Sequence, residues 1–173
     1  EDYAFVLNKH YVENYFIPFD FSVLNSIEPV NGIIYQNYCS PSNRLYFSDE
    51  NGKRIDAIRQ KIETYKDENL KNYLLTCLLE ATDRVQNTTG IYASFLKNLK
   101  SSARKTLKLH PEYINIANNT HNKVFKERAE KLIDNIKGSV LYLDPPCNTR
   151  QYGANYHLLN TIVNYSVPEE QTK

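Results

Sequence analysis

The sequence predicts an α/β fold built around a parallel sheet. Three observations predict it: a helical pattern at 127–137, a run of five consecutive mainly apolar residues at 139–143, and a second helical pattern from Asn155 to about Tyr165. A continuous apolar run is typical of a strand that is covered on both faces, as parallel strands are. A helix, a buried strand, a loop and another helix in this order favour a parallel α/β sheet.

Composition sets the outer limits. The 173 residues carry 21 Lys+Arg and 20 Asp+Glu, a formal net charge of +1, and a hydrophobic fraction of 41%. No run approaches the ~18–20 apolar residues of a membrane-spanning helix, so a membrane protein is excluded. Three scattered cysteines and four histidines without ligand spacing argue against disulfides and a metal site, and favour a reducing, cytoplasmic location.

The charge is distributed unevenly along the chain. Residues 1–49 carry −4, residues 50–137 carry +6 and residues 138–173 carry −1. The middle of the chain is therefore expected to be a basic insert between acidic flanks. Since the chain begins at Glu1 and contains no methionine, we also expect it to be a piece of a longer protein.

The N-terminal part predicts a helix and then irregular structure. Apolar residues at 3–16 recur at spacings of three and four, which predicts an amphipathic helix that ends before Pro18. Residues 31–52 hold two short apolar runs and end in the turn dipeptide Asn51-Gly52. This pattern predicts a loop with short strands.

The middle part predicts three helices. Residues 55–65 and 70–84 have apolar residues at helical period and predict two helices that pack together. From Tyr92 to Leu109 two stripes lie side by side, about 100° apart on one helix. The apolar stripe contains Leu96, Leu99, Ala103 and Leu107, and the basic one contains Lys97, Lys100, Arg104 and Lys108, with Lys105 beside it. The basic stripe fits a helix that follows phosphates, or else an ordinary solvated face.

After Pro111 the pattern predicts alternating strands and helices. Residues 113–116 predict a short strand, 127–137 a helix that ends at Gly138, and 139–143 the buried strand. That strand leads directly into Asp144-Pro145-Pro146-Cys147-Asn148. Ligands of open α/β sheets bind beyond the carboxyl ends of the strands, so we expect a site here.

The two prolines restrict this loop and remove two amide donors. A carboxylate beside outward-pointing carbonyl oxygens suits a substrate with a planar amino group, because such a group presents two N–H donors.

At this point the sequence resembles a known family. Leu143 to Asn148 resembles the DPPY motif of amino-methyltransferases that use S-adenosylmethionine. The continuation to Leu159 resembles DNA adenine methyltransferases of restriction–modification systems. Four further segments resemble the same subgroup, at 6–11, 35–38, 51–59 and 87–92.

The resemblance implies a partial Rossmann-like methyltransferase sheet with a mainly helical inserted target-recognition region. Residues 1–47 would then complete the cofactor-binding half and 48–110 would be the basic insert. Residues 111–173 would form the catalytic α/β part.

The resemblance also implies roles for individual residues. Asp144 and the carbonyl of Pro145 would accept hydrogen bonds from the exocyclic amine of a flipped adenine, in the rigid loop completed by Pro146 and Cys147. The methyl group would pass directly from S-adenosylmethionine, without a metal, by positioning and electrostatics. Asp144 and Asp2 would lie beside the cofactor. Candidates for DNA contact are Lys97, Lys100, Arg104, Lys105, Lys108, Arg150 and Tyr152.

Two departures from the family bear on activity. Cys147 replaces an aromatic residue, and base–aromatic stacking is worth roughly 1–3 kcal/mol per base. The glycine-rich first motif does not occur in the 173 residues, so the chain by itself is expected to be inactive.

The expected partners are double-stranded DNA and a cognate restriction endonuclease system, not a membrane, and the expected place is the bacterial cytoplasm, at the nucleoid. Two alternatives remain open. One is an amino-methyltransferase that acts on RNA or protein glutamine, and the other is a non-catalytic DNA-binding remnant.

Overall fold

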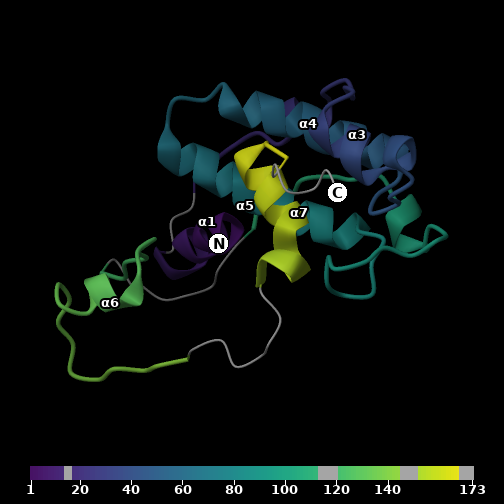
Figure 1. Cartoon of the computed structure of the whole chain (residues 1–173). Helices are drawn as coiled ribbons and strands as arrows, with labels where there is room; N and C mark the ends of the chain where they lie inside the picture. Colours follow the sequence, from purple (N-terminus) through teal and green to yellow (C-terminus); the bar gives the residue numbers. More distant parts are fainter. Residues whose placement is uncertain (14–16, 113–120, 145–151, 168–173) are drawn as a thin grey trace.

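A computed structural model describes residues 1–13, 17–112, 121–144 and 152–167 of the chain. Figure 1 shows most of the helices gathered into one body, with the segment around α6 set apart from it. Over these described residues the structure contains helices, turns and irregular segments, and no strand.

The two ends of the described chain lie against each other. The helix predicted at 3–16 is confirmed as α1 (Asp2–Glu13), and the last predicted helix is confirmed as α7 (Tyr152–Asn164). The amide of Tyr3 donates to Asn160 Oδ1 at 3.1 Å, and Asn164 Nδ2 donates to Asp2 Oδ2 at 2.6 Å. These bonds fix the N-terminus of α1 to the side of α7.

The two helices predicted in the middle of the chain are also confirmed. They are α4 (Asp49–Glu63) and α5 (Glu68–Val85), and they pack against each other. The side chain of Asp67 accepts from the amides of Asn69 and Leu70, which caps α5. The short helix α2 (Ser22–Asn25) packs on α4, while α5 contacts α1 and α7.

Residues 31–52 differ from the prediction of a loop with short strands. They form α3 (Ile33–Tyr38), the 3-10 turn η1 (Ser40–Ser42) and the first turn of α4. The Asn51-Gly52 pair is helical because Ser48 caps α4, its Oγ accepting from the amide of Asn51 at 3.3 Å.

The prediction of a helix from Tyr92 to Leu109 is wrong. This stretch is irregular except for the 3-10 turn η2 (Ser102–Arg104). Buried side chains from other elements bind its backbone groups, which therefore do not form an i to i−4 ladder. Its last residues alternate instead, since Leu107 and Leu109 are buried while Lys108 is exposed.

The prediction of an α/β sheet is also wrong. Residues 139–143 are extended but exposed, with Val140 88%, Tyr142 83% and Leu143 71% accessible. A strand is held by hydrogen bonds to a neighbouring strand, and no described segment forms one with these residues. The Rossmann-like sheet is therefore not found among the described residues, and the 113–116 strand prediction lies outside them.

The helix predicted at 127–137 is reduced to the single turn α6 (Ala129–Leu132). Among the described helices, none is long and apolar enough to cross a membrane.

One hydrophobic cluster joins the helical body. It contains residues from α1, α3, α4, α5 and α7, among them Val6, Ile34, Ile58, Leu78 and Leu158. Members thus come from all three ranges of the predicted domain division. In Figure 1, α7 crosses α5 within this body.

Candidate functional site

The carboxylate of the predicted catalytic motif is exposed. Asp144 ends the extended segment 138–144, and within the described part of the chain no hydrogen bond or ion pair engages it. Pro145, Pro146, Cys147 and Arg150 lie outside the described residues, as does the side chain of Tyr152. The motif is thus bounded by Asp144 on one side and by the first turn of α7 on the other.

The first turn of α7 is held by a loop that is distant in sequence. Tyr156 has non-helical angles (φ −132°, ψ 16°), so α7 is kinked after its first turn. The carbonyl of Asn155 accepts from the amide of Tyr92 at 2.9 Å. Tyr92 is itself buried, and its hydroxyl donates to Asp83 Oδ1 at 3.1 Å. The segment from Asn87 to Lys100, here the 87–100 loop, therefore contacts the helix that follows the motif.

A single buried asparagine closes the 87–100 loop. Asn87 Nδ2 donates to the carbonyls of Leu45 (2.8 Å) and Leu96 (2.9 Å). Its Oδ1 accepts from the amide of Lys100 at 2.9 Å, and its own amide donates to the carbonyl of Tyr46 at 2.8 Å. Asn87 thereby joins both ends of the loop to the segment that precedes α4.

The predicted DNA-contacting cations do not share one face. Lys100 is half-buried, and its Nζ donates to the carbonyl of Thr88 (2.9 Å) and to Gln86 Oε1 (3.3 Å). Lys97 and Arg104 are exposed, and Arg104 Nε donates to the carbonyl of Leu99 at 3.2 Å. Lys100 thus supports the loop, whereas Lys97 and Arg104 are exposed to solvent.

Lys105 and Lys108 lie on a separate piece of the chain, residues 103–109, which starts in η2 and continues as irregular structure; it is called here the 103–109 segment. Asn51 binds its backbone in both directions, because Nδ2 donates to the carbonyl of Lys105 at 2.8 Å and Oδ1 accepts from the amide of Leu107 at 2.8 Å. Asn25 does the same with both backbone groups of Leu109. The bound backbone leaves Lys105 and Lys108 exposed.

Asp2, predicted beside the cofactor, is bound by two neighbouring side chains. Its carboxylate pairs with Lys126 and accepts from Asn164. The hydrogen bond from Lys126 and that from Asn164 hold the pKa of the Asp2 carboxyl below its usual value. Asp2 thus links Lys126 and α7 to the start of α1.

Two buried charges on α4 were missed in the sequence, and both stabilise other helices. Asp56 accepts from the amides of Gly32 (3.1 Å), Ile34 (2.9 Å) and Tyr35 (2.8 Å) at the start of α3. Tyr165 donates its hydroxyl to the same carboxylate at 2.9 Å. Burial raises the pKa of the Asp56 carboxyl, and these donors oppose the rise.

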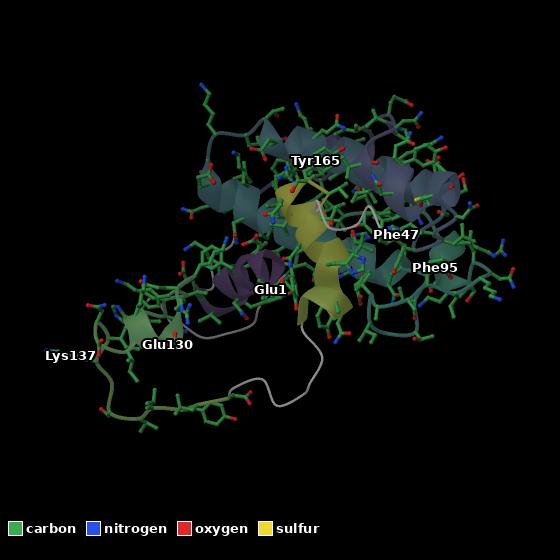
Figure 2. The ribbon with its side chains drawn as sticks, viewed as in Figure 1. Glu1, Phe47, Phe95, Glu130, Lys137 and Tyr165 are labelled. Carbon is green, nitrogen blue, oxygen red and sulfur yellow. The ribbon has the colours of Figure 1, made fainter. Side chains whose placement is uncertain are left out.

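Arg59, one turn further along α4, caps the end of α7. Its Nη2 donates to the carbonyl of Val163 at 2.7 Å and its Nε to that of Ile162 at 2.9 Å. A cation at a helix C-terminus is stabilised by the helix dipole. Figure 2 shows Tyr165 at this junction of α7 and α4. The signal in the sequence was a pair of charges one turn apart, interleaved with Ile55, Ile58 and Ile62.

The described cysteines are not activated, and the described histidine, cysteine and carboxylate side chains do not form a metal site. Cys39 and Cys77 are buried, and burial raises the pKa of the Cys77 thiol to about 12, so neither is an activated nucleophile. Among the described residues no group of histidine, cysteine and carboxylate side chains could hold a metal ion.

Comparison with known proteins decides the family. The family described as D12 class N6 adenine-specific DNA methyltransferase matches residues 2–173 of the chain. The chain belongs to this family. The resemblance in the sequence is therefore confirmed, although the part of the chain that the structure describes does not form the sheet that it implied.

This D12-family chain is similar to three curated methyltransferases. It is 49% identical to the type II methyltransferase M.NlaIII of Neisseria lactamica over 95% of this chain and 52% of that protein. It is 39% identical to M.FokI of Planomicrobium okeanokoites over 92% of this chain and 24% of that protein. It is also 39% identical to M.CviAII of Paramecium bursaria Chlorella virus 1, over 78% of this chain and 41% of that protein.

The chain thus spans about half the length of the first relative and less of the others. No solved structure matches it.

Proposed function

We propose that this D12-family chain carries the catalytic segment of an adenine-specific DNA methyltransferase. The enzyme transfers a methyl group from S-adenosylmethionine to the exocyclic amine of adenine in duplex DNA. The observation that carries the proposal is the sequence Asp144-Pro145-Pro146 within a family match over residues 2–173. The exposed carboxylate of Asp144 supports it, because a flipped base can reach an acceptor that no described residue occupies.

The reaction is a direct displacement. When bound, S-adenosylmethionine would supply a methyl group on a sulfonium, which the amine nitrogen would take as the C–S bond breaks and its electron pair stays on sulfur. The methylated nitrogen then loses one proton to solvent. Asp144 contributes by accepting a hydrogen bond from the amine, which orients the nitrogen toward the methyl group and stabilises the positive charge that develops on it. Adenine must leave the duplex to reach this acceptor.

The proposal includes the DNA-binding surface and the biological partners. Lys97, Arg104, Lys105 and Lys108 would contact phosphates, with Arg150 and Tyr152 beside the flipped nucleotide, and residues 48–110 would form the recognition region. A restriction endonuclease that cuts the same DNA sequence would be the functional partner. The place of action would be the bacterial cytoplasm, at the nucleoid.

The test is Asp144→Asn in the full-length protein. Because the amide carries no charge and has only one acceptor oxygen, we expect methyl transfer from labelled S-adenosylmethionine to fall by at least about 100-fold. The dissociation constant for duplex DNA should change by less than about twofold, which is about 0.4 kcal/mol. Asp134→Asn, an exposed acid in the turn that follows α6, is the matched control and should keep full activity. Retained transfer in Asp144→Asn would refute the assignment.

One rival function is favoured by a specific observation. Cys147 stands where the family has an aromatic ring, which favours a chain that binds DNA without methylating it. The same assay with duplex DNA, single-stranded RNA and a glutamine-containing peptide as acceptors separates the alternatives. Binding of DNA with no transfer to any acceptor would establish the non-catalytic function, and transfer to RNA or peptide alone would replace the DNA substrate.

A further inference from the structure

We infer that Asn87 is a positioning residue for methyl transfer. It holds the 87–100 loop in the shape that binds the first turn of α7, the described element that follows the Asp144-Pro145-Pro146 motif in the sequence. The inference rests on the proposed function of Asp144, and its test below also contains a measurement that does not depend on activity.

The first turn of α7 is bound by a residue outside its own helix. In a regular α-helix the carbonyl of Asn155 would accept from the amide four residues later. The non-helical angles at Tyr156 interrupt this ladder, and the carbonyl accepts from Tyr92 instead, at 2.9 Å. The remainder of α7 is packed in the core through Leu158 and Ile162, but that packing lies beyond the kink. The loop therefore binds the first turn directly, while the ring of Tyr156 at the kink lies 5.4 Å from the ring of Tyr3 on α1.

Asn87 in turn sets the shape of the loop. Tyr92 lies between Asn87 and Lys100, the two residues that the Asn87 side chain brings together. The side chain is completely buried, so its removal would leave two carbonyls and one amide without their partner. Unpaired buried polar groups are costly, and the loop would rearrange to satisfy them.

The other side of the motif offers little support. Residues 138–144 are exposed throughout, and the long side chains at 140–143 do not pack in the core. Among the described residues, α7 is the element closest in sequence to the motif that packs in the helical body. A displacement of about 1 Å at the reacting groups costs about 100-fold in rate, so a loosened first turn of α7 would show in the chemical step.

The experiment compares Asn87→Ala with Asn72→Ala in the full-length protein. Asn72 is a matched control, because it is also a buried asparagine whose Nδ2 donates to a backbone carbonyl, that of Val6 at 3.1 Å. Both variants should lose stability. The measurements are amide hydrogen exchange at 153–156, the single-turnover rate of methyl transfer, and the dissociation constant for duplex DNA.

We expect Asn87→Ala to speed exchange at 153–156 by about tenfold or more and to lower the single-turnover rate by about 10- to 100-fold. The dissociation constant for DNA should stay within about threefold, or about 0.7 kcal/mol. Asn72→Ala should leave both the exchange at 153–156 and the rate unchanged. Such a split is not expected of a residue that only stabilises the fold.

A second variant covers the case in which Asn87→Ala does not fold. Gly90 is exposed at the tip of the loop with φ +124°, and no atom lies within 4 Å of the position that a Cβ would take. Gly90→Ala therefore strains the loop without disturbing the core, and it should raise exchange at 153–156 in the same way.

Unchanged exchange in both loop variants, or equal changes in Asn72→Ala, would overturn the inference even in a protein that transfers no methyl group. Loss of transfer in the unmodified protein would overturn the proposed function alone.

Discussion

Gly32 lies where two side chains leave no room for a third. A Cβ at this position would be 2.3 Å from the hydroxyl of Tyr165 and 2.5 Å from Cγ of Asp56. Both neighbours are fixed, because Asp56 binds the start of α3 and Tyr165 follows the end of α7. The junction of three helices therefore depends on a residue without a side chain.

We expect Gly32→Ala to lower the free energy of unfolding by about 1–3 kcal/mol, since Asp56 or Tyr165 must move to admit the methyl group. Gly138→Ala is the control. Its nearest contact would be an ordinary 3.6 Å, to the carbonyl of Val140, and its stability should change by less than about 0.5 kcal/mol. Urea unfolding followed by circular dichroism measures both. Equal stabilities of the two variants would contradict the close packing at Gly32.

At the scale of elements, hydrophobic period predicted the helices that pack by one face. Apolar positions of 55–65 and 70–84 form the buried faces of α4 and α5, and in α1 Val6 is buried while Tyr3 and Leu7 pack against the core. The same rule failed for 92–109, where buried Asn51 and Asn87 bind the backbone that a helix would have used for itself. These hydrogen bonds from asparagine side chains to the backbone join positions that are far apart in sequence, so a local sequence pattern does not predict them.

The prediction of a strand at 139–143 failed for a different reason. The apolar residues there fit a covered strand, but covering requires neighbours, and no described segment supplies them. At the candidate site, the sequence located the motif through Asp144. It could not identify Asn87 or Tyr92 as neighbours of α7, because their bonds are tertiary.

The 103–109 segment lends itself to a test of DNA contact. If Lys105 and Lys108 each neutralise one phosphate, replacing both by glutamine should lower the slope of log affinity against log salt by about two. The control is the pair Lys61 and Lys66, which are exposed near the turn between α4 and α5. Filter binding of a fixed duplex between about 50 and 200 mM salt gives both slopes. Equal slopes for the two double variants would remove the 103–109 segment from the DNA-binding surface.

For the whole molecule, one core contains segments from both ends of the chain, while residues 129–144, which precede α7, are almost all exposed. Leu158 and Ile162 of α7 are fully buried in the hydrophobic cluster that also contains residues of α1, α3, α4 and α5. By contrast, Figure 2 shows Glu130 and Lys137 of the exposed segment well away from Phe47 and Phe95 of the body. The position of α7 therefore depends on its packing in the core, and the chain at 129–144 contributes little to it.

Limited trypsin digestion tests this separation. Cleavage should occur first after Lys131 or Lys137, since exposed backbone with few contacts is the preferred site of nicking. The two fragments should still elute together in size-exclusion chromatography, because the core contacts of α7 survive the cut. Leu158→Ala removes part of that packing, at a cost of about 2–5 kcal/mol, and should release the C-terminal fragment at protein concentrations at which the unmodified fragments still elute together. First cuts within α4 or α5, or separate elution of the unmodified fragments, would mean that the 129–144 connection itself keeps α7 in place.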